Sequence, residues 1–235
     1  MLHECREVKI NKISRDGCDL KETMILADEA RVILTVDDSI DFNFVCSPCD
    51  VKELCIGRIV CEGMITSAEQ IEKIEISGED PITVSVKILE SGKDGKSCDF
   101  SGQDNGKTIV PSKDEVFRML ETVGDYQKMH QKTGATHSCA LFCEGELVKN
   151  FEDIGRHNAL NKAVGYAYDN NMDVSRCALY FTGRVMSETV ERVASAHIPM
   201  LITKSLPMYE AVEKAKRKNI ALVGRAWPDS YCVFE

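Results

Sequence analysis

The chain has 235 residues, 43% of them hydrophobic, which allows one large domain or a large and a small one. Its net charge of −9 lies wholly in residues 1–110, with 13 Lys and Arg against 22 Asp and Glu, because residues 111–235 carry 16 of each. The acidic first half argues against a nucleic-acid or anionic-membrane surface there, so an anionic ligand is expected in the second half.

The chain also shows no targeting or membrane signal. Its start, MLHECREVKI, lacks the apolar stretch of an export signal, and no later segment approaches the roughly 20 apolar residues of a membrane span. The eleven cysteines are scattered and odd in number, which favours reduced thiols over a disulfide framework. We therefore expect a cytoplasmic protein with no membrane and no nucleic-acid partner.

The first half reads as a small α+β domain. Short β-branched segments with acidic breaks predict a mainly antiparallel sheet, and they lie at 6–13, 23–27, 30–36, 40–46, 71–77 and 82–90. Apolar residues at helical spacing predict one amphipathic helix after Pro48. Residues 91–107 hold four glycines, much charge and the single cysteine Cys98, and they predict a loop that ends a domain spanning 1–110.

The second half, 111–235, alternates strands and helices. Pro111 followed by Ser112 and Glu115 has the spacing of a capping box and predicts a helix start. The segments that follow read as strands at 138–143, 146–151, 177–181, 199–203, 220–223 and 231–234, with helices from about 155 and at 187–196 and 208–218. This order predicts an α/β fold with a largely parallel sheet covered by helices on both faces.

Basic residues follow four of these strands. The strand ends present Arg156, Arg184, Lys204 and Arg225, three of them directly after a glycine. Ligands of open parallel sheets bind beyond the carboxyl ends of the strands, where helix N-termini and arginines suit phosphate. The pattern predicts a crevice for a large phosphorylated ligand. His157 taken alone is more typical of a packed, hydrogen-bonded histidine, because it precedes the apolar stripe of its helix.

Several blocks resemble a known family. "TGATHSCAL" at 133–141 and "EDIGRHNALNK" at 152–162 are similar to the FdhD family of formate dehydrogenase accessory sulfurtransferases. "FTGRVMSETV", "HIPMLITKSLP" and "LVGRAWPDSYCVF" resemble later segments of that family, and "SPCDVKELCIGRIVCEGMI" resembles an earlier one. The resemblance covers nearly the whole chain.

The resemblance implies a cytidine-deaminase-like three-layer αβα fold, a homodimer and a sulfur carrier. Such a carrier takes persulfide sulfur from a cysteine desulfurase and passes it to the bis-molybdopterin guanine dinucleotide cofactor of molybdenum or tungsten, which the formate dehydrogenase catalytic subunit then receives. Cys98 would carry the persulfide, and a GDP-like nucleotide would bind as a fragment of the cofactor. The implied cofactor-binding residues are Thr133, Gly134, His137, Glu152, Asp153, Gly155, Arg156, His157, Gly183, Arg184, Lys204, Ser205, Gly224, Arg225, Ala226, Trp227, Pro228, Asp229 and Ser230. Glu152 or Asp153 would orient Arg156 and His157.

The chain departs from the family pattern in the sulfur loop and at its end. "SCDFSG" has Cys98 at the first cysteine position but Ser101 at the second, and Asp99 beside Cys98 disfavours a thiolate. Trp227 stands at a usual arginine position, and His197 stands for a glycine. An alternative function is therefore a chaperone that binds the cofactor without sulfur transfer.

Two further readings are weaker. Cys46 and Cys49 have ligand spacing, but a four-thiolate zinc site needs a second close pair, so we expect no protein-bound zinc or other metal. A zinc deaminase needs His-x-Glu and Pro-Cys-x-x-Cys signatures, and neither occurs.

Overall fold

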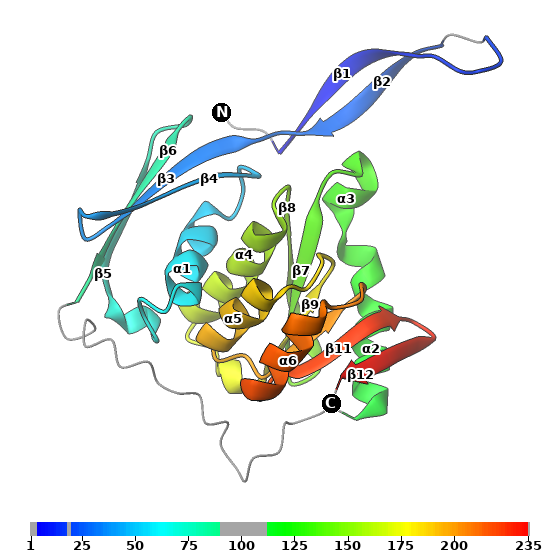
Figure 1. The fold of residues 1–235 in the computed structure, drawn as a ribbon. Coiled ribbons are helices and arrows are strands. Elements are labelled where there is room, and N and C mark those ends of the chain that lie inside the picture. The colour runs from blue at the N-terminus through cyan, green and yellow to red at the C-terminus, as the bar shows by residue number, and fades with distance from the viewer. Residues whose placement is uncertain (1–3, 18–19, 90–111, 235) are drawn as a thin grey trace.

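A computed structural model describes residues 4–17, 20–89 and 112–234 (Figure 1). Within these ranges the strands form a two-stranded, a four-stranded and a six-stranded sheet. None of the helices described is both long enough and apolar enough to cross a membrane. The segment with Cys98 lies outside the described residues.

The six-stranded sheet has the order β12-β11-β10-β9-β7-β8. Its strands are β7 (His137–Cys143), β8 (Glu146–Asp153), β9 (Cys177–Phe181), β10 (Met200–Thr203), β11 (Ala221–Trp227) and β12 (Ser230–Phe234). Strands β9, β10 and β11 are parallel, but β7 is antiparallel to both β8 and β9, and β12 is antiparallel to β11. The expected largely parallel sheet is therefore wrong in part: the sheet is mixed.

Tight turns account for this difference. Glu144 and Gly145 both have positive φ and join β7 to β8 as a two-residue hairpin, which can only produce antiparallel strands. For the other strands the alternation of strands and helices predicts the direction correctly. Strands β8, β9, β10 and β11 all run the same way.

Helices cover both faces of this sheet, giving three layers. The helices are α2 (Lys113–Val123), α3 (Lys128–Thr133), α4 (Arg156–Asp169), α5 (Ser187–Ser195) and α6 (Tyr209–Arg217). Buried residues of α4, α5 and α6 join one core cluster, while those of α2 join a second on the opposite face. The predicted capping box of α2 is confirmed: the Ser112 hydroxyl accepts from the Glu115 amide, and the Glu115 carboxylate accepts from the Ser112 amide. The cytidine-deaminase-like assignment stays a prediction.

The first half forms two sheets, not the single one expected. Its elements are β1 (Cys5–Lys12), β2 (Leu20–Ala27), β3 (Ala30–Val36), β4 (Ile40–Cys46), α1 (Val51–Cys61), β5 (Ile71–Ser77) and β6 (Ile82–Ile88). Strands β1 and β2 make a hairpin that extends away from the body (Figure 1). The other sheet has the order β4-β3-β6-β5 and is mainly antiparallel, but β6 joins β3 in parallel.

The two halves share one hydrophobic core. A single buried cluster contains Leu34 and Val84 from the four-stranded sheet, Leu54 from α1, and Leu160 and Leu179 from the second half. The predicted division into two domains at 110/111 stays a prediction. In the described residues, α1 from the first half and α4 from the second half pack in the same core cluster.

The contact between α1 and α4 is made backbone to backbone at two glycines. A Cβ atom added to Gly57 would lie 1.8 Å from the Asn161 carbonyl oxygen, and one added to Gly165 would lie 1.8 Å from the Glu53 carbonyl oxygen. No side chain larger than hydrogen fits between the helices at either position. This close approach fixes the C-terminal end of α1 beside the N-terminal end of α4.

We predict that Gly57→Ala forces α1 and α4 apart and destabilises the protein by about 1–3 kcal/mol or more, the usual range for overpacking a core. Urea unfolding followed by circular dichroism measures the effect. Gly124→Ala is the matched control, because a Cβ at Gly124 meets nothing within 4 Å. Equal midpoints for the two variants would contradict the close contact.

Candidate functional site

The candidate site lies at one edge of the six-stranded sheet. The carboxyl ends of β8, β9, β10 and β11 point to this edge, and the first residue of β7, His137, pairs there with Asp153 at the end of β8. Phe181 pairs with Thr203, so the segments that follow β9 and β10 start side by side. The topology thus places the basic strand ends along one edge.

A pocket of about 330 Å³ opens at this edge. It is lined by Gln127, His130, Gly134, Ala135, Thr136, His137, Thr182 and Lys204. Three of the expected residues, Gly134, His137 and Lys204, therefore meet in one cavity. Gly134 ends α3 with φ +67, and its amide donates to the His130 carbonyl, so the "TGATH" block turns the chain from α3 into β7.

Glu152 supports the pocket wall and does not orient Arg156 or His157 as expected. Its carboxylate accepts hydrogen bonds from the amides of Met129 and His130, at 2.8 and 2.7 Å, and from the Thr136 hydroxyl at 3.1 Å. The first turn of α3 is capped by this side chain, which satisfies two otherwise free amides.

Asp153 also does not orient Arg156 or His157, because it pairs with Lys162. It is fully buried, and its carboxylate lies 2.7 Å from the equally buried ammonium of Lys162 on α4. It also accepts from the amides of Ser47 and Gly155. Burial alone would lower the pKa of Lys162, but the attraction of Asp153, reinforced by nearby thiols, raises it above its usual value.

Arg156 and His157 occupy the first turn of α4, as the sequence predicts. Nε of Arg156 and Nε2 of His157 are buried and have no hydrogen-bond partner among the described residues. The carboxylate nearest to His157 is Glu188 of α5, 3.9 Å from its Nδ1, and Glu188 also binds Arg192. Two nitrogen atoms at this helix start are thus unsatisfied by the described part of the chain, and a bound group could accept from them.

Arg156 packs directly on the segment after β9. A Cβ added to Gly183 would lie 3.0 Å from the Arg156 Cβ, so only a glycine permits the contact. The Gly183 carbonyl accepts hydrogen bonds from the hydroxyls of Thr203 and Ser205. These bonds join the ends of β9 and β10 and hold exposed Arg184 beside them.

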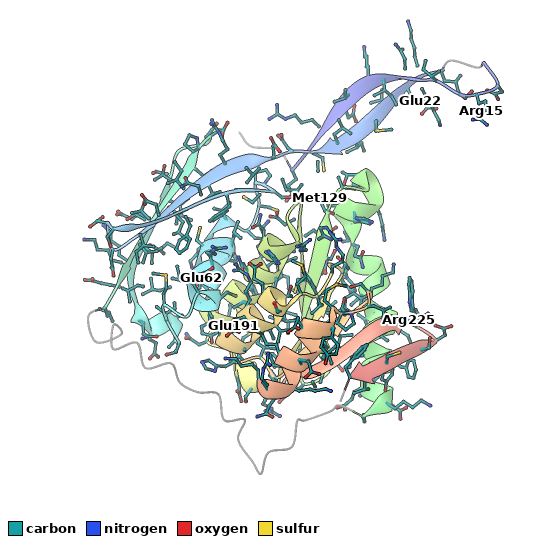
Figure 2. The ribbon with its side chains drawn as sticks, in the orientation of Figure 1. Arg15, Glu22, Glu62, Met129, Glu191 and Arg225 are labelled. Atoms are coloured by element: carbon teal, nitrogen blue, oxygen red, sulfur yellow. The ribbon has the colours of Figure 1, made fainter. Side chains whose placement is uncertain are left out.

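Strand β11 contains a bulge near its C-terminal end. Arg225 has φ +47, in the left-handed region, and the register with β12 shifts between Gly224 and Trp227. Trp227 is 43% exposed, and the Lys204 ammonium lies 4.5 Å from its ring centroid. Figure 2 shows Arg225 at the rim of this strand.

The rest of the final motif lies in the core and in the turn that leads into β12, and its cofactor-binding role stays a prediction. Ala226 is buried in the core cluster under α2. Pro228 and Asp229 form the turn into β12, where Asp229 accepts a hydrogen bond from Ser230. Gly224 packs so tightly that a Cβ would lie 2.9 Å from atoms of Phe234 and Pro207.

Thr133, at the end of α3, forms hydrogen bonds within its own turn. Its hydroxyl donates to the Met129 carbonyl and accepts from the Ala135 amide.

Positive charge gathers around His137. Burial lowers its pKa from the usual value, and the charges of Arg156, His130 and Arg184 lower it further. The imidazole is therefore uncharged near neutral pH when the edge is empty of anions. Burial likewise lowers the pKa of His157, with Glu188 opposing the shift.

The described cysteines are free thiols. As expected for core strands, Cys139 and Cys177 are buried, and burial raises the pKa of both. Burial also raises the pKa of Cys46 to about 12 and that of Cys49 to about 11, despite the nearby Lys162. No group of three or more His, Cys, Asp or Glu that could hold a metal occurs in residues 4–17, 20–89 and 112–234.

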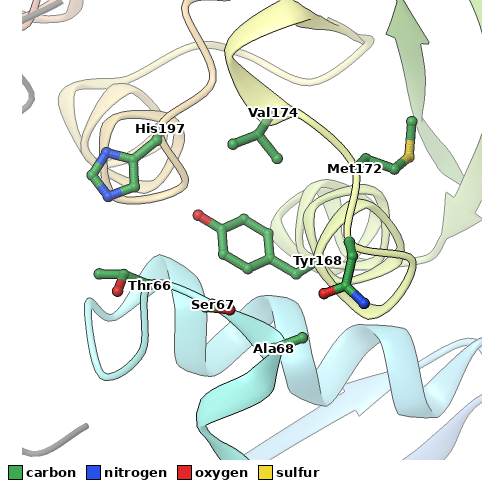
Figure 3. A pocket seen from close by; sticks show the side chains of 8 residues that line it. Thr66, Ser67, Ala68, Tyr168, Met172, Val174 and His197 are labelled. Atoms are coloured by element: carbon green, nitrogen blue, oxygen red, sulfur yellow. The ribbon is translucent and has the colours of Figure 1, made fainter.

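A second pocket, of about 230 Å³, lies among the loops at the C-terminal end of α4 (Figure 3). Tyr168 and His197 line it together with Ser67 and Ala68. His197 has φ +53, which explains why glycine suits this position in the resembled family.

Sequence reasoning missed the residues that complete the edge pocket. Gln127, His130 and Thr136 come from α3 and its flanks, a short helix that the sequence pattern did not indicate. The sequence analysis also assigned no role to Lys162, Arg192 or Glu188. The pattern gave no signal for Lys162, which lies on the side of α4 away from Leu160 and is nevertheless buried.

Comparisons with known proteins identify the family of this chain. A family model described as the FdhD/NarQ family matches residues 27–235. The chain belongs to this family.

Relatives and a solved structure extend the likeness to almost the full length. A sulfur carrier protein FdhD of Geobacillus kaustophilus is 29% identical and covers 89% of this chain and 88% of its own length. A sulfur carrier protein FdhD of Sulfurisphaera tokodaii is 27% identical and covers 98% and 97%. A crystal structure of a formate dehydrogenase accessory protein from Desulfotalea psychrophila has a TM-score of 0.81 at 23% identity, over 99% of this chain and 97% of that one, which shows the shared fold.

We predict that inorganic pyrophosphate binds this edge more tightly as pH falls. A bound anion cancels the positive charges that lower the pKa of His137, so the pKa rises on binding. Affinity should increase as pH falls through the pKa of the complex and level off below the pKa of free His137, a window around the usual histidine value of about 6.5.

Calorimetry across this window tests the prediction. Pyrophosphate itself takes up protons, so the comparison with His137→Gln isolates the histidine. The variant should lose part of the pH dependence, while His197→Gln, in the second pocket, should keep all of it. Identical profiles for His137→Gln and the native chain would show that His137 does not respond to the anion.

Proposed function

We propose that this protein is a sulfur carrier that accepts persulfide sulfur on Cys98 and delivers it to a bis-molybdopterin guanine dinucleotide cofactor of molybdenum or tungsten bound at the edge site. A cysteine desulfurase supplies the sulfur, and the catalytic subunit of formate dehydrogenase receives the product. The names of the relatives and the family membership support the carrier role.

The observation that carries the proposal is the cationic edge. Arg156, Arg184 and Lys204 follow three strands that run in the same direction, and Arg225 lies near the end of a fourth, β11. Their positive charges therefore lie along one edge. Guanine dinucleotides contain pyrophosphate groups, which guanidinium groups bind through paired hydrogen bonds. Nε of Arg156, at the start of α4, has no acceptor among the described residues.

The cofactor is not part of this structure, but the residues present fit it. The unsatisfied nitrogens, the pocket with His137 and Lys204, and the exposed Trp227 provide donors and an aromatic face. When bound, the cofactor would supply the metal that takes up the sulfur. This chain would bind its phosphates, and its thiol would carry the sulfur.

We predict that GDP, as a cofactor fragment, binds and that Arg184→Ala and Arg156→Ala each weaken binding by about 1.5–3 kcal/mol, the usual scale for a hydrogen bond to a charged group. Calorimetry measures the loss. Arg118→Ala on the exposed face of α2 is the matched control and should bind like the native chain. If neither strand-end variant weakens binding, the nucleotide binds elsewhere.

We predict that incubation with a cysteine desulfurase and cysteine adds sulfur to Cys98, located by mass spectrometry of peptides, and that Cys98→Ala abolishes this label. The exposed Cys232 supplies the matched control, because Cys232→Ala should label normally. Label found mainly on Cys46 or Cys49 would move the sulfur chemistry to that pair.

The same variant decides between the two candidate functions. A cofactor chaperone without sulfur transfer would keep both GDP binding and maturation activity in Cys98→Ala. A sulfur carrier would keep GDP binding and lose maturation activity.

A further inference from the structure

A pair of cysteines lies at the edge of the six-stranded sheet opposite the candidate site. Cys143 is the last residue of β7 and Cys177 the first of β9, and the two are directly opposed in the antiparallel ladder. Side chains opposed in this way have Cβ atoms about 4.5–5.5 Å apart, close to the separation that a disulfide spans. The adjoining residues reinforce the register: the Glu144 amide donates to the Arg176 carbonyl at 3.0 Å, and their side chains form an ion pair.

The two thiols are in contact with each other and differ in burial. Cys177 is 2% exposed and Cys143 is half-buried. Burial, together with the charge of Cys143 and a hydrogen bond with it, raises the pKa of Cys177 to about 12. Cys177 is therefore protonated at neutral pH, and its thiol donates to the Asp173 carbonyl at 3.5 Å. The half-buried Cys143 sulfur is the one that a reagent from solution reaches first.

Access to the pair comes from the side of Cys143, which is half-buried, whereas Cys177 is 2% exposed. Both side chains pack in the core cluster that contains the buried residues of α4. A pocket of about 340 Å³ between α2 and the starts of β9 and β10 lies on the other face of the sheet, because its residues Met119, Ala178 and Met200 belong to the other core cluster. A small molecule with an electrophilic sulfur atom therefore reaches Cys143 directly from solvent. The pocket shares no residue with the cationic edge pocket.

We propose that Cys143 and Cys177 form a dithiol–disulfide couple that reacts with small molecules carrying electrophilic sulfur, namely low-molecular-weight disulfides or inorganic polysulfides. With a disulfide, the Cys143 thiolate attacks one sulfur, forms a mixed disulfide and releases one thiolate. Cys177 then loses its proton to solvent and attacks the Cys143 sulfur, which forms the cross-strand disulfide and expels the second thiolate. The two cysteines are oxidised, and the reagent is reduced to two thiols. With a polysulfide, the Cys143 thiolate attacks a terminal sulfur, breaks its S–S bond and releases the polysulfide shortened by one sulfur, which leaves a persulfide on Cys143. Cys177 then attacks the inner Cys143 sulfur, forms the disulfide and expels the outer sulfur as hydrosulfide.

The couple is independent of the proposed function, because neither cysteine belongs to the edge site or to the segment with Cys98. Sulfur transfer could fail while the couple forms, and the converse also holds. An intramolecular disulfide here would tie the ends of β7 and β9 that lie farthest from His137 and Thr182.

The test treats the folded, reduced full chain with glutathione disulfide or with inorganic polysulfide, blocks free thiols by alkylation, and maps peptides without reduction. Both reagents should yield a peptide pair linked through Cys143 and Cys177, and dithiothreitol should separate it. Recovery of both cysteines in alkylated form, in samples where the exposed Cys232 has been modified, would overturn the proposal.

Variants identify the order of the steps. Cys177→Ser should trap the adduct on Cys143, as a glutathionyl group with the first reagent and as one added sulfur atom with the second. Cys143→Ser should give no linked peptide and leave Cys177 alkylated only after unfolding. Cys232→Ser should link like the native chain. Circular dichroism shows which variants fold, and the result with the native chain stands even where Cys177→Ser does not.

Discussion

The buried pair of Asp153 and Lys162 connects the parts of this protein on which the site depends. Asp153 ends β8, Lys162 lies on α4, and both contact the segment before α1, since the Asp153 carboxylate accepts from the Ser47 amide and the Lys162 ammonium lies 3.4 Å from the Ser47 carbonyl. Breaking such a pair leaves an uncompensated charge in the interior and costs about 3–5 kcal/mol. The pair therefore determines where α4 begins, and with it the positions of Arg156 and His157.

The glycine contact between α1 and α4 acts together with this pair. Gly57 and Gly165 allow the two helices to approach until backbone meets backbone, so Glu62 at the end of α1 reaches Arg192 on α5. Arg58 pairs with the same carboxylate, and burial lowers the pKa of Arg58, with the charge of Arg192 lowering it further. Residues of α1 from the first half of the chain thus pack beside the start of α4, although the basic strand ends that suggested a phosphate site all lie in the second half.

Local signals predicted the helices other than the short α3, and most strands, because periodicity and capping act within a few residues. The start of α2 at Ser112 and the start of α4 after Gly155 are examples. Sheet topology depended on contacts between distant residues, so the parallel pairing of β3 with β6 was not visible. The hairpin at Glu144 and Gly145 was not predicted, because the alternation of strands and helices around it favoured a parallel interpretation.

The difference between local signals and contacts between distant residues also explains which features of the site could be predicted. The basic strand ends were predictable because each lies at or just after the end of its own strand. The partners of Glu152 and Asp153 were not predictable, because adjacency in "EDIGRHN" suggested that acid and base meet. Successive residues of a strand point to opposite faces, so Glu152 turns toward α3 and Asp153 toward α4, and neither reaches Arg156. The carboxylate that faces His157 comes from α5 instead. One consequence is electrostatic: with both neighbouring acids engaged elsewhere, the positive charges of Arg156, Arg184 and Lys204 are left without a partner in the described ion pairs, and an anion is the group that would compensate them.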